Sequence, residues 1–457
     1  MPDWLDHAVD YAMEWIAHQV RRQELPGCVM ACHHRAFVVE RAFGCADLST
    51  GERLTPRHRF RVASHSKSFT ASAIMRLREQ GRVRLDDAAG HHIGGLHPDA
   101  AQATIGQLLS HASGITRDGR DSGQWADRRP FLAADELKAD LALPPVIEPN
   151  ARFKYSNHAY GLAGMVVEAV AGEPFADFLR REIIAAAGLA ETDPDAPVAT
   201  GIPVARGHSA KVPLGRRMVV PGSNPTRALA PATGVVSTAH DLVRFFAQLD
   251  PTAPGSMLSR ASRREMIRRQ WREPHLSTER YYGLGIRSGT TEGWDWFGHG
   301  GAFQGFASRT VMLPEQALTL SIVVNATDGP AMLLIDGVIH ILQTFARRGP
   351  PTPAVSDWNG RWWSIWQAHD LVPMGDRVLV GDPAKPLPFQ DASELVVTSE
   401  DSGSIVLASG TGHHGECVRR TRGPRGDIST IWLAGNELVR EADFVAEMTM
   451  RYGKSSS

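Results

Sequence analysis

Apolar residues recur along this chain at two different spacings, and these spacings predict its elements. The first 22 residues place their apolar side chains on one side of a helix, and residues 332–348 do the same. Residues 26–44 predict two strands joined by a polar turn. From residue 281 to residue 326, four apolar runs separated by turn residues predict an antiparallel meander.

The middle of the chain predicts helices. One begins near Ser64 and closes near Gly81. Residues 157–184 predict two helices that separate near Gly172, and residues 234–249 predict a further helix. Together with the two terminal helices and the meander, this order of elements indicates a sheet flanked by helices.

The last quarter of the chain has a different pattern. Residues 349–357 have the composition of a linker, and short alternating apolar runs fill residues 358–457. These runs predict a small antiparallel β domain, a barrel or a sandwich, with the four tryptophans of WNGRWWSIWQ in its core. The predicted organisation is a main domain over residues 1–348, a linker, and this β domain.

Length, charge and the N-terminus exclude several classes of protein. The 457 residues exceed one ordinary domain of roughly 100–200 residues. A formal net charge of −1 gives no reason to expect nucleic acid or an acidic membrane as a partner. The N-terminus does not look like a signal peptide, and no run approaches the roughly 18 apolar residues of a membrane span. We therefore expect a cytoplasmic protein.

Cysteine and histidine positions give no metal-binding pattern. The four cysteines include no CxxC pair, so free thiols are favoured over a disulfide or a metal site. The 19 histidines form no HExxH or comparable spacing. A metallohydrolase is therefore disfavoured, and neither a metal nor another cofactor is expected. An α/β-hydrolase is disfavoured as well, because Gly-x-Ser-x-Gly does not occur.

Three serines surround one lysine in residues 64–68, where a helix is predicted to begin. Positions three apart share a helix face, so Lys67 lies beside Ser64, whereas Ser66 and Ser68 point elsewhere. A serine hydroxyl becomes a nucleophile when a base accepts its proton, and a partly buried lysine can be that base or hold another base ionised. This spacing predicts Ser64 as the nucleophile, although Ser-x-x-Lys by itself also occurs as an ordinary surface pair.

A second candidate group lies in FKYSNHAYG, where Tyr155 and Asn157 precede a predicted helix. Nearby positive charge lowers the pKa of a tyrosine from about 10, so a phenolate beside an ammonium group is a competent general base. The amide of Asn157 can hold Lys67 or a substrate carbonyl. A packed tyrosine followed by a capping asparagine is the simpler alternative for this motif taken alone.

A third candidate group lies in FGHGGAFQGF, where His299, Gly300 and Gly301 fall on a predicted strand. The glycines let another backbone approach closely. The backbone N–H of Ala302 is then available as an oxyanion donor. An ordinary glycine-rich bend in a strand is the alternative.

Ser-x-x-Lys, Tyr-x-Asn and His-x-Gly, in this order, resemble the motifs of the serine β-lactamase and penicillin-binding protein superfamily. Within that superfamily the motifs look like those of the group of class C β-lactamases, DD-peptidases, D-aminopeptidases and esterases. Further segments resemble blocks of that family over roughly residues 5–345, among them FRVASHSKSFTA, IGQLLSHASGI, PATGVVSTAHDLVRFF and YYGLGI. The C-terminal region resembles the barrel domains appended to some peptidases of this group.

The resemblance implies a fold and a set of roles. It implies a mixed α+β fold, with a β-lactamase-like antiparallel sheet flanked by helices, a helical subdomain and a C-terminal barrel-like domain. It makes Ser64 the acylated nucleophile, and Lys67 and Tyr155 would share the proton transfers. Asn157 would orient these groups, and the N–H groups of Ser64 and Ala302 would form the oxyanion hole.

One departure from the family motif affects the expected substrate. The third motif is usually Lys-Thr-Gly, whose lysine and hydroxyl help to bind a substrate carboxylate, and here His299 and Gly300 replace both. A neutral imidazole offers one donor and no fixed charge, although Arg309 or another arginine is able to compensate. This favours substrates without a carboxylate at that place.

The expected function is that of a serine amidase or peptidase that forms an acyl-enzyme on small or short-peptide substrates, including those that contain D-amino acids. A carboxylesterase of the same fold is the second candidate, since it needs the same serine and oxyanion hole. A β-lactamase ranks third. A catalytically inactive binding protein is the fourth, disfavoured because the serine, lysine and tyrosine are all present.

Overall fold

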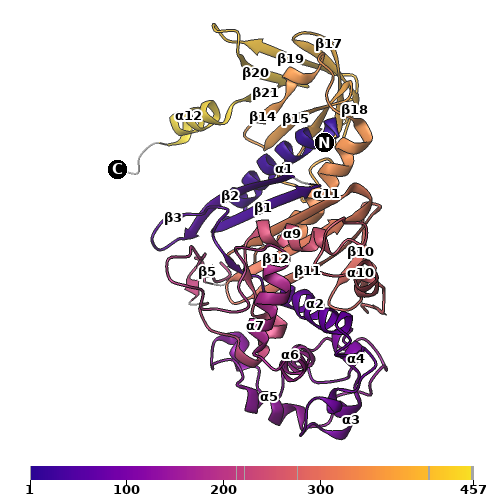
Figure 1. Ribbon diagram of the computed structural model, residues 1–457. Helices are drawn as coiled ribbons and strands as arrows, with labels where there is room; N and C mark the ends of the chain where they lie inside the picture. Colours follow the sequence, from indigo (N-terminus) through magenta and orange to yellow (C-terminus); the bar gives the residue numbers. More distant parts are fainter. Residues whose placement is uncertain are drawn as a thin grey trace. The chain divides into compact units, whose positions relative to one another are not determined.

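A computed structural model describes residues 2–453 of the chain, except 36, 213, 221, 275, 410 and 411 (Figure 1). The chain forms two compact units: one comprises Glu24–Ile335, and the other combines Met1–Gln23 with Asp336–Ser457. The predicted domain boundary near residue 348 stays a prediction, since compactness groups the N-terminal segment with the C-terminal one. No helix in the described part of the chain has the length and apolarity needed to cross a bilayer.

The larger unit is built on an antiparallel sheet of nine strands in the order β3-β2-β1-β13-β12-β11-β10-β9-β8. The predicted hairpin of residues 26–44 forms its β1 and β2, and the predicted meander supplies β9 to β13. The strands are β1 (Gly27–His34), β2 (Phe37–Asp47), β3 (Glu52–Arg53), β8 (Trp271–Arg272), β9 (Arg280–Tyr282), β10 (Arg287–Thr291), β11 (Trp294–Phe303), β12 (Phe306–Leu313) and β13 (Leu318–Val324).

Two short ladders accompany this sheet. The first pairs β4 (Phe60–Arg61) with β7 (Val236–Ser237), and the second pairs β5 (Gly207–His208) with β6 (Val219–Val220). The β4–β7 ladder joins the chain just before Ser64 to the chain just before helix α9 (Ala239–Gln248). It also shortens the helix predicted over residues 234–249, because its first residues are held in a strand.

Helices pack beside the sheet of this unit, and α2, α4 and α6 lie together in Figure 1. They are α2 (Ser66–Glu79), α3 (Pro98–Gln102), α4 (Ile105–Leu109), α5 (Ala134–Leu141), α6 (Asn157–Ala171), α7 (Phe175–Leu179), α8 (Ala230–Thr233), α9 (Ala239–Gln248) and α10 (Arg260–Ile267). The α9 helix packs on β1, β12 and β13, and α6 packs on α2 and α8. Gly172 ends α6 in a left-handed conformation, φ +75°, as the predicted break requires.

The start of α6 is fixed by its own sequence. Ser156 has extended backbone angles, and its side chain accepts a hydrogen bond from the N–H of Ala159. This N-cap satisfies one of the free N–H groups of the first turn. The cap at Ser156 thereby fixes the backbone of its two neighbours, Tyr155 and Asn157.

The smaller unit contains a closed antiparallel barrel, drawn in orange to yellow in Figure 1. Its strands are β14 (Gly360–Trp363), β15 (Ala368–Met374), β16 (Arg377–Gly381), β17 (Ser393–Ser399), β18 (Ser402–Leu407), β19 (Cys417–Arg422), β20 (Ile428–Leu433) and β21 (Asn436–Val439). Its helices are α1 (Asp3–Arg22), most of α11 (Ala331–Arg348), and α12 (Glu441–Tyr452). The expected fold class, an antiparallel sheet with helices plus a barrel-like C-terminal part, is confirmed.

The barrel holds α1 through polar contacts. The hydroxyl of Tyr11 donates to Asp370 at 2.9 Å, and Arg361 donates to both oxygens of the same carboxylate at 2.7 and 2.8 Å. Of the four tryptophans that we predicted in the core, Trp358 and Trp362 are buried there and Trp363 is half-buried. Trp366 is 84% exposed at the turn between β14 and β15, so the prediction was wrong for that residue.

Candidate active site

The chain makes a sharp turn immediately before Ser64. A short 3-10 helix (Ala63–His65) links β4 to α2, and Ala63 has φ +48°, a value that residues other than glycine rarely adopt. Ser64 is partly exposed, whereas Ser66 and Ser68 are buried and donate to the carbonyl oxygens of Ala63 and Gly285, each at 2.6 Å. Of the three serines, Ser64 is the one that lines an open cleft in this unit.

Lys67 is fully buried, and its ammonium group has three acceptors. Its Nζ donates to Ser64 Oγ at 3.2 Å, to Asn157 Oδ1 at 2.7 Å and to the carbonyl oxygen of Ala232 at 2.8 Å. Burial lowers the pKa of Lys67, although the neighbouring Tyr155 opposes the change. The three acceptors hold the amine in a single place beside the serine.

Tyr155 contacts the same serine from another side. Its hydroxyl lies 2.9 Å from Ser64 Oγ, and Lys67 Nζ lies 4.8 Å from the centre of its ring. Burial alone would raise the pKa of Tyr155, but the charges of Lys67 and Arg287 outweigh it and lower that pKa below its ordinary value. Arg287 is itself held by Glu273 at 2.7 Å. Tyr155 is therefore suited to act as a base.

Asn157 is oriented by a residue that the sequence did not point to. Its Nδ2 donates to Asp118 Oδ1 at 2.6 Å, and its backbone N–H donates to the carbonyl oxygen of Arg117 at 2.9 Å. Asp118 also accepts from the indole N–H of Trp125 at 2.9 Å. Because the carboxylate takes the amide N–H₂ group, the amide oxygen is left to face Lys67.

His111 brackets Tyr155 and was also missed as a site residue. Its carbonyl oxygen accepts from the N–H of Lys154 at 2.8 Å, and its Nδ1 accepts from the N–H of Ser156 at 3.1 Å. The centres of the His111 and Tyr155 rings lie 4.1 Å apart. Burial, followed by the charge of Lys67, lowers the pKa of His111 well below its ordinary value, so the ring is neutral. The only signal in the sequence was its place in the IGQLLSHASGI block.

The structure places the third predicted motif on β11. The side chain of His299 is fully buried, with Nε2 3.1 Å from the hydroxyl of Tyr282, and it does not line the cleft. Gly300, Gly301 and Ala302 do line the cleft together with Ser64. A direct contact between the imidazole and a substrate therefore has no support from this geometry.

Backbone geometry gives Ala302 its place near the serine. Phe303 and Phe306 are partners across a two-residue turn. Residues that flank such a turn exchange backbone hydrogen bonds, and the pattern alternates along the ladder, so the next residue, Ala302, is expected to turn its N–H away from β12. On that side β10 pairs no further than Gly298. A Cβ atom at Gly301 would collide with the carbonyl oxygen of Val62, which shows how closely β11 approaches the segment of Ser64.

The cleft over Ser64 has a volume of about 590 Å³ and four arginines in its lining: Arg117, Arg280, Arg287 and Arg309. Arg309 is paired with Gly300 across β12 and β11, and its guanidinium lies 4.2 Å from the centre of the Trp296 ring. A Cβ atom at Gly300 would lie 3.6 Å from Cδ of Arg309. The aliphatic part of the Arg309 side chain thus runs alongside Gly300.

The fold and this site define a recognisable class of protein. The Beta-lactamase family model matches residues 12–342, more than half of the chain. The chain therefore belongs to the β-lactamase family.

Individual relatives agree with this assignment. Penicillin-binding protein 4 of Amycolatopsis lactamdurans is 27% identical over 321 residues, which cover 66% of this chain and 81% of that protein. Other curated relatives match over 38% or 34% of their own length.

Solved structures show the same fold. A D-stereospecific amidohydrolase from Streptomyces sp. superposes with a TM-score of 0.63 at 26% identity and covers 72% of this chain and 97% of its own. The octameric penicillin-binding protein homologue from Pyrococcus abyssi has a TM-score of 0.67 at 20% identity and covers 94% and 100%. The family and the amidohydrolase neighbour support a hydrolase.

Proposed function

We propose that this protein is a serine hydrolase that forms an acyl-enzyme on Ser64 and cleaves amide or peptide bonds of small substrates, including substrates that contain D-amino acids. The observation that carries the proposal is the convergence of an amine and a phenol on one partly exposed hydroxyl, with distances of 3.2 and 2.9 Å to Ser64 Oγ. The structural neighbour named as a D-stereospecific amidohydrolase supports an amide as the bond that is cleaved and D-amino acids as part of the substrates.

Acylation would proceed with Tyr155 as the base. In its phenolate form Tyr155 accepts the proton of Ser64 across the 2.9 Å contact, and Oγ forms a bond to the substrate carbonyl carbon. The electron pair of the carbonyl moves to its oxygen, which the N–H groups of Ser64 and Ala302 would stabilise. The C–N bond then breaks, and the phenol returns its proton to the leaving amine.

Deacylation would use the same groups in reverse. Water enters the place of the amine, loses a proton to the phenolate of Tyr155 and attacks the ester carbon, and Ser64 leaves with that proton. Lys67 stays charged throughout this cycle and stabilises the phenolate of Tyr155. Its three acceptors hold Nζ beside Ser64 Oγ and 4.8 Å from the centre of the Tyr155 ring.

Covalent labelling and a substrate panel test the proposal. A fluorophosphonate probe should label the wild-type protein and not Ser64→Ala, whereas Ser68→Ala serves as the matched control and should still be labelled. D- and L-amino-acid p-nitroanilides, p-nitrophenyl esters and nitrocefin should then rank amidase, esterase and β-lactamase activity. Equal labelling of Ser64→Ala would remove Ser64 from its role, and turnover of esters alone would replace the amidase by the carboxylesterase.

A further inference from the structure

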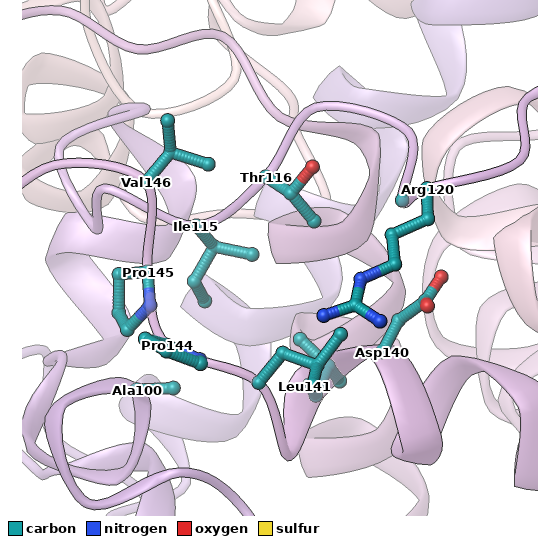
Figure 2. Close-up of a pocket in the computed structure, with 11 residues that line it drawn as sticks. Ala100, Ile115, Thr116, Arg120, Asp140, Leu141, Pro144, Pro145 and Val146 are labelled. Atoms are coloured by element: carbon teal, nitrogen blue, oxygen red, sulfur yellow. The ribbon is translucent and has the colours of Figure 1, made fainter.

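A second cavity, with a volume of about 230 Å³, lies in the larger unit, and Ser64 is not part of its lining (Figure 2). Its walls come from residues 115–120, from the end of α5 and from residues 143–146. Most of its lining is apolar, contributed by Ile115, Leu141, Leu143, Pro144, Pro145 and Val146. Nothing in the proposed reaction uses this space.

The cavity has one charged end. Figure 2 shows Arg120 and Asp140 on one side, whereas Pro144, Pro145 and Val146 lie on the other. The carboxylate of Asp140 is held in position, since one of its oxygens lies 2.8 Å from Nε2 of the fully buried His158. A negative and a positive group thus stand together at the end of an apolar pocket.

We propose that this cavity binds a free apolar α-amino acid. The ammonium group of the ligand would face Asp140, its carboxylate would face Arg120, and its side chain would lie among the prolines and Val146. The size agrees, because a cavity of roughly 150 Å³ holds benzene and drug-sized ligands need about 300–1,000 Å³. A side chain such as that of leucine or methionine fits between these limits.

The same stretch of chain also contacts the active site. The carbonyl oxygen of Thr116 accepts from Ser156 Oγ at 2.6 Å, that of Arg117 accepts from the N–H of Asn157, and Asp118 holds the amide of Asn157. A ligand in the cavity stabilises the arrangement of residues 115–120 seen here, in which the contacts from Asp118 through Asn157 to Lys67 are intact. We expect occupancy to raise turnover to the extent that the empty protein departs from this arrangement. This second effect rests on the proposed function, whereas binding does not.

Calorimetry on the full-length Ser64→Ala protein tests binding without turnover. The probes are D- and L-leucine and D- and L-methionine, with acetate and butylamine as ligands that carry only one of the two charges. We expect at least one amino acid to bind, and at least tenfold more weakly to Asp140→Asn and to Arg120→Gln. Arg128→Gln, an exposed arginine outside this cavity, is the matched control and should bind normally.

Each outcome decides the proposal. Absence of binding by all four amino acids overturns it, and so does equal affinity of the folded Asp140→Asn and Arg120→Gln variants, which would place the ligand in the cleft of Ser64 instead. Arg120→Gln keeps the test valid if Asp140→Asn fails to fold, since Arg120 is exposed. If binding is found and the wild-type rate with its best substrate does not rise, the site stands and its coupling to turnover is refuted.

Discussion

Replacing His111 by phenylalanine separates its two contributions to the position of Tyr155. Phenylalanine keeps a ring against the tyrosine but removes the Nδ1 acceptor, which leaves the N–H of Ser156 without its 3.1 Å partner. A buried donor without a partner costs about 1–3 kcal/mol. If the same free energy is lost from the transition state because Tyr155 is displaced, kcat falls roughly 5- to 150-fold, since each 1.4 kcal/mol is a factor of about ten.

The assay is steady-state kinetics on the best p-nitroanilide together with thermal unfolding. We expect kcat to fall and KM to stay nearly constant, because the imidazole does not line the cleft. The pH profile should keep its shape, since one neutral ring replaces another. Asparagine at the same position is the complementary variant: it retains a polar acceptor and loses the 4.1 Å ring contact, so stability should fall by roughly 2–3 kcal/mol.

A folded His111→Phe protein with wild-type kcat would refute this reasoning. It would show that the ring alone positions Tyr155 and that the hydrogen bond to Ser156 has no kinetic consequence. A large change in KM with unchanged kcat would also contradict it, since the contacts described here involve the base and not the substrate.

Three further predictions concern the charges and the backbone around the cleft. Arg287→Gln removes one of the charges that lower the pKa of Tyr155. The phenolate is the active form and is lost as pH falls, so the acid limb of kcat/KM should move to higher pH. The Arg287→Lys variant keeps the positive charge and should leave that limb in place. Gly301→Ala should lower kcat about 10- to 100-fold by pushing β11 from the serine, whereas Gly300→Ala, with more space, should change it less than threefold; equal effects would contradict the close approach. Arg309→Ala should weaken kcat/KM about tenfold for substrates that carry a carboxylate and leave neutral ones unchanged, which a matched pair of amide substrates checks.

Local pattern was enough to predict much of the fold. The hairpin of residues 26–44 and the later meander could be predicted because strand signals and turn residues define them without distant contacts. The helix predicted from residue 234 begins instead at Ala239, because Val236 and Ser237 pair with β4. Helix propensity cannot register a pairing with a strand more than 170 residues away along the chain, so the error lies where tertiary structure overrides it.

The candidate site divides along the same line. Spacing on a helix puts Lys67 beside Ser64, and the family motifs supply Tyr155 and Asn157, which the structure brings to the same serine. Their chemical roles stay predictions. The sequence could not identify the supporting residues. Asp118 contacts Asn157, 39 positions away, and His111 contacts Ser156, 45 positions away, and neither pair has a recognisable spacing.

The neighbouring positions Gly300 and Arg309 constrain how this site can change. A Cβ atom at position 300 would lie 3.3 Å from the carbonyl oxygen of Ser308 and 3.6 Å from Cδ of Arg309, so the larger threonine of the family motif would compete with the arginine side chain for the same space. The side chains at these two paired positions on adjacent strands therefore share one space. We therefore expect a cleft with the usual Lys-Thr-Gly motif to carry a residue smaller than arginine at position 309.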